Sequence, residues 1–330
     1  MPIFSRESRL RQQSTETLRL ALSIPLLVFS LSCRPSKIFY VVEDIRVPAV
    51  QTLQKFASPV SGQNCLTLAG ETHCQQYPLR PAQKNALRFL VLAPPGAQPV
   101  TLQLTKLKRT QLVQPLPADA ACKLINDASL GQFDIEVPLA TLGLSTTPAS
   151  RTVVQETPIR IEEHVIAFDS PASEVLNGEF SQMGTLPLFK LEYVATSGAL
   201  TADTGVLTFP VVAQPTSSET PTQSCLSRLL TGNGSPITNT PPSISALSPA
   251  RGEVVAGSPV TLQMTLSGGD TDPSAKQRVQ WYLSRGELDN QRAAKAELTF
   301  SGSEPLTAVG IVRDLQGGID FAWTTFSARQ

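Results

Sequence analysis

Short stretches in which apolar and polar residues alternate run through this chain, and they constrain its fold more than any other feature. Between Pro259 and Leu266 every second residue is apolar, and Val279, Trp281 and Leu283 repeat that spacing. The segment Val100–Leu107 follows the same pattern. A period of two puts the apolar side chains on one face of a strand. The pattern therefore predicts half-buried β-strands.

Composition favours the same fold class. The chain has 27 prolines in 330 residues, above the usual share of about 5%. Proline lacks the donor that a helix interior needs, whereas strands joined by turns tolerate it. Hydrophobic residues make up 41% of the chain, enough for packed cores, and charged residues only 16%. We expect an all-β protein built from β-sandwich modules.

The N-terminus has the three parts of a secretory signal. Basic residues precede the apolar run Leu20–Leu31, and small residues follow it. The run is too short to span about 30 Å of hydrocarbon, and Pro25 interrupts it. These features predict a cleaved signal peptide over residues 1–32 and export of the mature chain. The basic residues of the leader are Arg6, Arg9, Arg11 and Arg19.

The cleavage region Ser30-Leu-Ser-Cys33 resembles the lipobox of bacterial lipoproteins. That resemblance implies that Cys33 becomes the first mature residue and carries acyl chains that anchor the protein in a membrane. Arg34, where an aspartate would favour retention at the inner membrane, implies the outer membrane. The alternative is cleavage by an ordinary signal peptidase after Ser32, with Cys33 left as a thiol.

Cysteine usage agrees with an oxidising compartment. If Cys33 carries lipid, an even number of cysteines remains for disulfides. Cys65 and Cys74 bracket two short arms around Gly70, so we expect them to pair, which leaves the other two as a second pair. A zinc site using His73 and Cys74 is the competing interpretation, but the spacings of structural zinc sites are absent. The disulfide candidates are Cys65, Cys74, Cys122 and Cys225.

A chain of this length predicts roughly two folded units after processing. A stretch rich in Pro, Thr and Ser separates them and is typical of a linker. Pro117–Asn126 is the best candidate for a helix, since proline suits a first turn. The expected organisation is a signal peptide at 1–32, a lipid-anchor tether at 33–37, a larger β-rich domain at 38–213, a linker at 214–240 and a β-sandwich at 241–330.

Several motifs in the last ninety residues resemble the Ig-like and PKD-like repeats of Gram-negative surface lipoproteins. The resemblance implies a C-terminal Ig-like sandwich with Trp281 in its core, and roles as spacers, adhesins or parts of envelope assemblies. Glu43–Val50 resembles the first strand of such repeats, which implies that the N-terminal region is an enlarged relative. The motifs are Asn239–Ile244, Gly257–Leu262, Asp270–Pro273, Gln280–Ser284 and Val312–Gly318.

Charge argues against a nucleic-acid surface. The chain has 27 basic and 27 acidic residues, and removing the four arginines and two glutamates of the leader leaves 23 basic and 25 acidic. The mature charge is therefore −2, and the mature chain contains no run of Lys or Arg.

Catalytic motifs are absent from the sequence. A hydrolase triad needs an oriented histidine beside a nucleophile, and neither His73 nor His164 lies in such a motif. Glu162 and Glu163 beside His164 are expected to form a solvated strand edge. Scattered carboxylates, as in glycosidases, remain the alternative. We expect no enzyme and no cofactor.

An acidic turn is a candidate calcium site. Asp270 and Asp272 flank Thr271, and Asp314 is expected on a loop at the far side. Calcium prefers carboxylate oxygens but needs six to eight of them, so a solvated turn is the competing interpretation.

These features together predict a non-enzymatic outer-envelope lipoprotein whose β modules contact another protein. A saccharide-binding or glycan-processing protein is the alternative from another class, and it would need exposed aromatic side chains. A subunit of an envelope machine, localised by its lipid, is the third.

Overall fold

The computed structural model describes most of the chain after residue 39, and all described residues belong to one compact unit, Tyr40–Gln330. Within them the chain is almost entirely β-strand, with a short 3-10 helix at Leu139–Leu142. None of these residues forms a helix with the length and hydropathy that crossing a membrane requires. The described ranges are 40–60, 65–75, 79, 83–112, 132–146, 150–169, 185–210, 241–250, 252–255, 258–268, 277–314 and 317–329.

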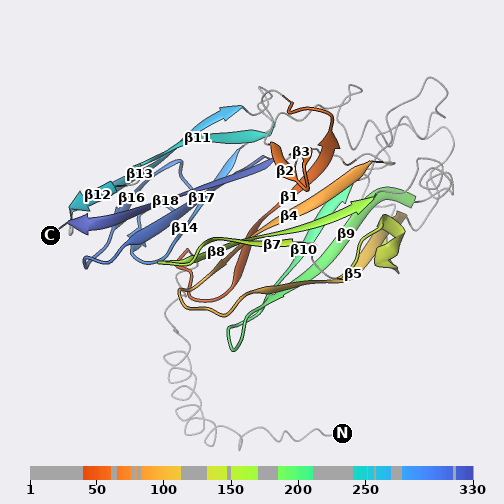
Figure 1. Ribbon diagram of the computed structural model, residues 1–330, viewed down its shortest axis with the longest axis horizontal. Helices are drawn as coiled ribbons and strands as arrows, with labels where there is room; N and C mark the ends of the chain where they lie inside the picture. The colour runs from red at the N-terminus through yellow and green to blue at the C-terminus, as the bar shows by residue number, and fades with distance from the viewer. Residues whose placement is uncertain are drawn as a thin grey trace, which may run out of the picture. The chain divides into compact units, whose positions relative to one another are not determined.

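The first ten strands form one sandwich (Figure 1). They are β1 (Arg46–Phe56), β2 (Cys65–Leu68), β3 (Glu71–Gln75), β4 (Lys84–Ala93), β5 (Thr101–Leu112), β6 (Gln132–Val137), β7 (Ser150–Gln155), β8 (Arg160–Asp169), β9 (Thr185–Thr196) and β10 (Asp203–Pro210). One sheet has the order β2-β3-β1-β4-β8-β7 and the other the order β10-β9-β5-β6, and every pairing in both is antiparallel.

Alternation along β4 builds the core of this first sandwich. Leu87, Phe89 and Val91 point between the two sheets, where they meet apolar side chains of β5 and β9. The ring of Phe89 lies edge-on to Tyr193 with centroids 5.3 Å apart, a favoured aromatic geometry. Every second side chain of β4 thus faces the core of the first sandwich.

The last eight strands form an Ig-like sandwich. They are β11 (Pro242–Ser248), β12 (Gly252–Val255), β13 (Val260–Gly268), β14 (Arg278–Leu283), β15 (Glu287–Leu288), β16 (Lys295–Thr299), β17 (Leu306–Arg313) and β18 (Ile319–Arg329). The sheets are β11-β13-β16-β15 and β12-β18-β17-β14, and β12 runs parallel to β18. Trp281 of β14 is fully buried between them, as expected, and its indole N–H donates to the carbonyl of Ala293 at 2.9 Å.

Two strands are buried on both faces, and this joins the sandwiches. Leu90 and Leu92 of β4 point away from the first core and pack against Val309 and Ile311 of β17 in a third apolar cluster. β14 and β18, the neighbours of β17 in its sheet, add further side chains to the same cluster, among them the ring of Phe321. The four sheets therefore form four successive layers, which explains why β4 and β17 are nearly continuous apolar runs.

Polar contacts also cross this junction. The amide of Gln51 donates to the carbonyl of Ile319 at 2.8 Å, and the guanidinium of Arg88 lies 4.6 Å from the ring centroid of Phe321. The amide of Gln155 donates to the hydroxyl of Thr307 at 2.8 Å. Buried polar groups in good geometry fix one arrangement of the surfaces that they join.

The segment before β1 lies along the edge of β14. Tyr40 and Val42 exchange backbone hydrogen bonds with Leu283 of β14, at 2.7 and 2.9 Å. The Tyr40 hydroxyl accepts from the backbone N–H of Leu288 at 3.0 Å. Tyr40 packs against the second core, and Val42 belongs to the junction cluster. The start of the first sandwich is thus attached to the second.

The predicted all-β sandwich class is confirmed, and most predicted strands form within a few residues of the expected bounds. The apolar run Lys37–Val42 also predicts an opening strand, and this prediction is wrong in its described part, because only Val41 makes a single bridge there. The Cys65–Cys74 disulfide is present, across a hairpin whose turn residues Ala69 and Gly70 both have positive φ.

Other predictions fall outside the described residues. These are the signal peptide at 1–32, Cys33, the tether at 33–37, the helix at 117–126, Cys122, Cys225, the whole linker at 214–240, and Asp270 and Asp272.

Candidate functional site: the junction slot

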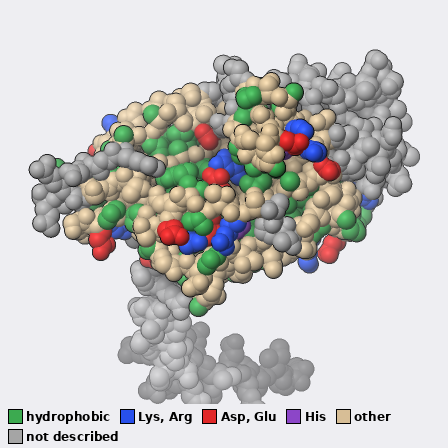
Figure 2. All heavy atoms as spheres, viewed as in Figure 1, with side chains coloured by type: hydrophobic (Ala, Val, Ile, Leu, Met, Phe, Trp, Pro, Cys, Tyr) green, Lys and Arg blue, Asp and Glu red, His purple; other side chains and the backbone are tan. Residues whose placement is uncertain are grey.

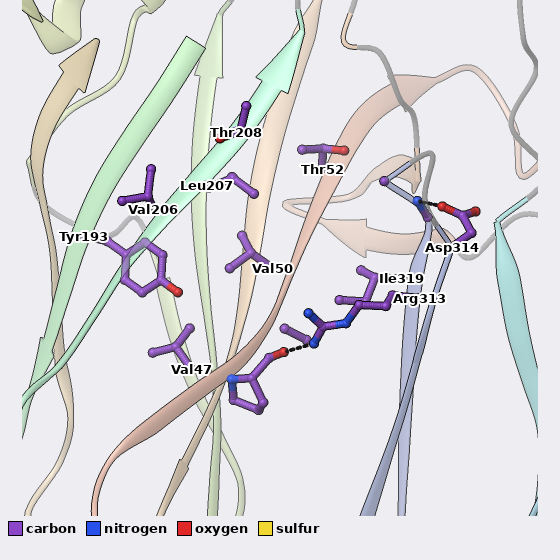
Figure 3. A pocket seen from close by; sticks show the side chains of 14 residues that line it. Val47, Val50, Thr52, Tyr193, Val206, Leu207, Thr208, Arg313, Asp314 and Ile319 are labelled. Atoms are coloured by element: carbon purple, nitrogen blue, oxygen red, sulfur yellow. Dashed lines mark hydrogen bonds between the residues drawn. The ribbon is translucent and has the colours of Figure 1, made fainter. Parts of the chain in front are cut away.

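An open cavity of about 370 Å³ lies where the two sandwiches meet (Figure 3). We call it the junction slot. Its volume is at the lower end of the range typical of ligand sites. Four elements build it: the first half of β1, the middle of β10, Tyr193 of β9, and the turn from β17 to β18. Its lining residues are Val47, Pro48, Ala49, Val50, Thr52, Tyr193, Val206, Leu207, Thr208, Arg313, Asp314, Gly317, Gly318 and Ile319.

The slot lies between the edges of two strands. β1 pairs with β3 only from Leu53 onward, so Val47–Gln51 has no neighbouring strand on that side among the described residues. β10 ends its sheet and pairs only with β9 in the described chain. The backbone N–H of Val47 donates to Asp203 of β10 at 2.6 Å, which brings the two edges together.

Charged groups at the slot are held by the protein itself. The guanidinium of Arg313 donates to the carbonyl of Pro48 at 2.8 Å (Figure 3). The carboxylate of Asp314, one of the acidic residues predicted from sequence, is buried and accepts from the backbone N–H of Gly318 at 2.7 Å. The slot is therefore polar at its β17–β18 side and apolar along Val47 and Val50.

Tyr193 gives the slot a hydroxyl group that stays protonated. Burial and the charge of Asp203 raise the pKa of Tyr193 to about 12, and the nearby Arg313 only partly opposes them. At neutral pH the phenol therefore remains a hydrogen-bond donor. Figure 3 shows its ring between Val206 and Val47, with the hydroxyl directed toward the β1 side.

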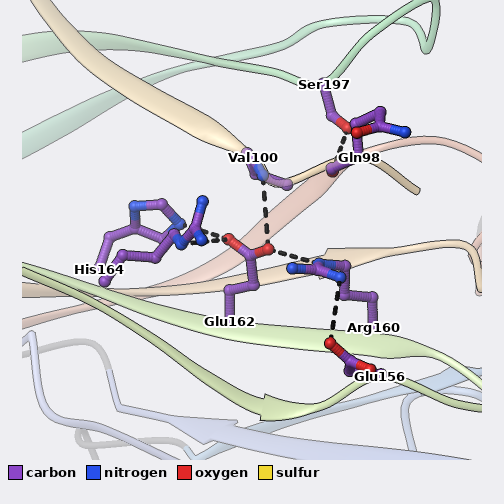
Figure 4. A network of polar contacts seen from close by, with 8 residues as sticks. Gln98, Val100, Glu156, Arg160, Glu162, His164 and Ser197 are labelled. Carbon is purple, nitrogen blue, oxygen red and sulfur yellow. Dashed lines mark hydrogen bonds and ion pairs between the residues drawn. The ribbon is translucent and has the colours of Figure 1, made fainter. Parts of the chain in front are cut away.

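A second polar constellation lies inside the first sandwich (Figure 4). Glu162 is 1% exposed, and its carboxylate contacts Arg160 Nε at 2.5 Å and His164 Nε2 at 2.9 Å. The backbone N–H of Val100 donates to it at 3.4 Å. The predicted solvated edge is therefore wrong for Glu162 and His164, because residues i, i+2 and i+4 of a strand share one face, and here that face is covered. Only Glu163, paired with Arg88, lies on the other face.

This network is built to hold a buried charge. Burial raises the pKa of Glu162, but the hydrogen bonds from His164, Arg160 and Val100 and the charge of Arg160 outweigh it, so the net pKa is lowered. Within the described residues no serine, threonine or cysteine hydrogen bonds to the His164 ring, whose Nδ1 has no partner there. The arrangement is a structural network of ion pairs and hydrogen bonds, and it holds no activated nucleophile among the described residues.

The remaining site predictions have separate outcomes. Cys74 is in a disulfide, so the zinc alternative using it is wrong. Asp314 lies at the slot, but its two expected calcium partners are outside the described residues. Among the residues that the structure describes, no group of three or more His, Cys, Asp or Glu could hold a metal. The calcium site stays a prediction.

The slot itself was not found from sequence. β1 and β10 are far apart in the chain, and only the fold brings their edges together. A partial signal exists, since Pro48 interrupts β1 and cannot donate to a ladder, which marks a strand edge or bulge.

Comparisons with known proteins give only distant likenesses. Tandem Ig repeats of Dlar align at 9% identity and a TM-score of 0.26, over 76% of this chain and 92% of that one. Fibronectin(III)-like modules of Clostridium thermocellum CbhA align at 11% and 0.25, over 86% and 95%. Murine CEACAM1b aligns at 12% and 0.21, over 76% and 94%. TM-scores this low do not establish a shared fold, so the Ig-like assignment rests on the sheets themselves.

No family model matches the chain, and no curated protein sequence matches it.

Proposed function

We propose that this chain is a non-enzymatic lipoprotein of the outer envelope that binds a protein partner at the junction slot. The observation that carries the proposal is the slot, an open cavity bounded by two strand edges where the two sandwiches meet. Strand edges bind other chains through their backbone groups.

Export and anchoring rest on the leader and Cys33. The Cys65–Cys74 disulfide supports an oxidising compartment, because disulfides rarely persist in the cytosol. The short chain between Cys33 and Tyr40 spans at most about 25 Å when fully extended. An acylated Cys33 would therefore hold both sandwiches close to the membrane surface.

The positions of the aromatic side chains weigh against saccharide binding. Sugar stacking needs exposed rings, but Trp281 is fully buried and Trp323 packs against the junction cluster. Phe133 of β6 is 45% exposed, but it is the only exposed aromatic ring among the described residues. Tyr193 and Tyr282 are also buried. Charged groups on the face drawn in Figure 2 lie in small groups of mixed sign, which suits a neutral protein surface more than a highly charged partner.

Extraction of the full-length chain from membranes in mild detergent tests the proposal. A photo-crosslinking residue replaces Val206 at the slot, and a matched variant carries it at Val255 of β12; the two valines are 59% and 62% exposed. We expect one stoichiometric protein adduct from position 206 that is absent from position 255. A monomer without adducts that binds glycan arrays would refute the proposal.

The mass of the same extracted protein tests the anchor. We expect residues 33–330 plus acyl chains, less four hydrogens for two disulfides. An unmodified chain that begins elsewhere would remove the lipoprotein part of the proposal and leave the slot untouched.

A further inference from the structure

We infer that the partner enters the junction slot as an extended polypeptide segment, which adds to β10 as a further strand. This inference rests on the proposed function and names the chemistry of the partner: a neutral segment without proline, with small apolar or hydroxyl side chains.

The first support is the way in which β10 lines the slot. Val206, Leu207 and Thr208 are consecutive, and successive side chains of a strand point to opposite faces. Three consecutive residues can line one cavity only if the cavity runs along the edge of the strand. The slot therefore faces the backbone groups of β10 that β9 does not use.

The second support is that the middle of the β10 edge lacks the usual protection. Exposed edges are commonly blocked by charged side chains, proline, bulges or extreme shortness. β10 begins at Asp203, whose carboxylate already accepts from the backbone of Val47, and ends at Pro210. Between these ends the residues from Thr204 to Phe209 include no charge and no proline, and the pairing with β9 is regular over the whole strand. Val206 is 59% exposed in the middle of this edge.

Several other edges in the described chain are protected. β6 carries Asp134 and Glu136, which pair with lysines, and β7 carries Arg151. The edge of β14 is covered by the bridge from Val41 to Leu283. β15 has only two residues. Among these edges, β10 combines regular pairing, an uncharged stretch from Thr204 to Phe209 and an adjoining cavity.

The third support is the chemistry of the facing wall. Val47 and Val50 present apolar surface opposite Val206, while Arg313 and Asp203 are already bonded to the backbone of β1. An incoming segment meets no uncompensated charge, so a neutral one fits. A cavity of about 370 Å³ leaves room for small side chains.

Selection of short random peptides, displayed on phage, against the folded full-length chain tests the inference. A selected peptide is synthesised, and its affinity is measured by calorimetry. Val206→Lys places a charge in the edge and should weaken binding by about tenfold or more. Val255→Lys, the matched exposed valine, should leave the affinity unchanged.

Methylation of peptide nitrogens gives a readout specific to strand addition. Alternate N–H groups of an added strand face β10, so N-methylation at one set of alternate positions should weaken binding by about tenfold. Methylation at the other set should have little effect. Equal sensitivity at all positions, an unchanged affinity for Val206→Lys, or no enriched peptide would overturn the inference.

These outcomes are separable from the failure of the proposed function. A partner that still crosslinks at position 206 but binds through a folded surface, with no dependence on peptide N–H groups, would keep the proposed function and reject strand addition.

Discussion

Gly205 is required by the side chain directly opposite it. It pairs with Tyr193 across β10 and β9, and a Cβ atom there would lie 2.2 Å from the phenol oxygen. The aromatic ring covers the glycine, an arrangement that stabilises glycines in sheets. The same ring lines the junction slot, so the absence of a Cβ atom at Gly205 allows Tyr193 to take its place there.

Gly205→Ala should therefore destabilise the first sandwich. The ring of Tyr193 is held by Phe89, so the added methyl forces a shift that costs about 1–3 kcal/mol. Thermal unfolding of the variant measures the loss. Thr204→Ala, the neighbour on the same strand, is the control and should change stability by about 0.5 kcal/mol or less. Equal melting temperatures for both variants would contradict the packing seen here.

Glu162→Gln should show what the buried charge contributes. Removing the buried partner leaves Arg160 with only its longer contact to the exposed Glu156, and costs about 3 kcal/mol at neutral pH. The folded pKa of Glu162 is lowered, so its stabilisation is complete above the unfolded value of about 4.3 and disappears as the pH falls through the folded value. Urea unfolding should show a smaller difference from wild type at about pH 3.

The control for this experiment is Glu156→Gln. Glu156 also contacts Arg160, at 3.7 Å, but its side chain is 73% exposed. Its loss should have a small effect at either pH. If the cost of Glu162→Gln were the same at both pH values, the charge of Glu162 would not be the source of the stability.

At this scale the sequence predicts single faces well and neighbouring layers poorly. The alternation around Trp281 correctly predicts its burial. The spacing of Arg160, Glu162 and His164 puts them on one face and could have indicated a polar cluster. What covers that face is the chain near Val100, which is 62 residues from Glu162 and is not evident from local spacing.

Among the elements, the short segment Tyr40–Val42 connects parts of the fold that are far apart in the sequence. It joins the edge of β14 and gives an acceptor to the backbone of Leu288, although it precedes the first sandwich in sequence. Tyr40→Ala should speed amide hydrogen exchange at Leu283 and Leu288 in the second sandwich. Tyr40→Phe keeps the packing and should affect Leu288 alone. Unchanged exchange in the alanine variant would show that the segment Tyr40–Val42 does not stabilise the second sandwich.

Strand prediction succeeds where one chain segment carries the signal. β13 and β14 alternate, and β4 and β17 are continuous apolar runs, so each is evident locally. The local sequence does not predict β7, β12 and β15, because these strands lie at sheet edges, where pairing rather than periodicity defines them. The order of strands in each sheet depends on long-range pairing and could not be predicted.

At the scale of the molecule, the junction makes the two sandwiches interdependent. Calorimetry of the wild-type chain should show one cooperative transition. Phe321→Ala removes a ring from the junction cluster and its contact with Arg88, a loss of about 3 kcal/mol, and should separate the transition into two. Two resolved transitions in the wild type would mean that the sandwiches unfold independently.

The claim that the junction slot binds the partner is tested most directly by hydrogen exchange of the full-length chain with and without its crosslinked partner protein. We predict slower exchange in Asp203–Pro210 of β10 and in the first half of β1, because the added segment covers these edges. Protection confined to other strands, with β10 unchanged, would contradict the claim.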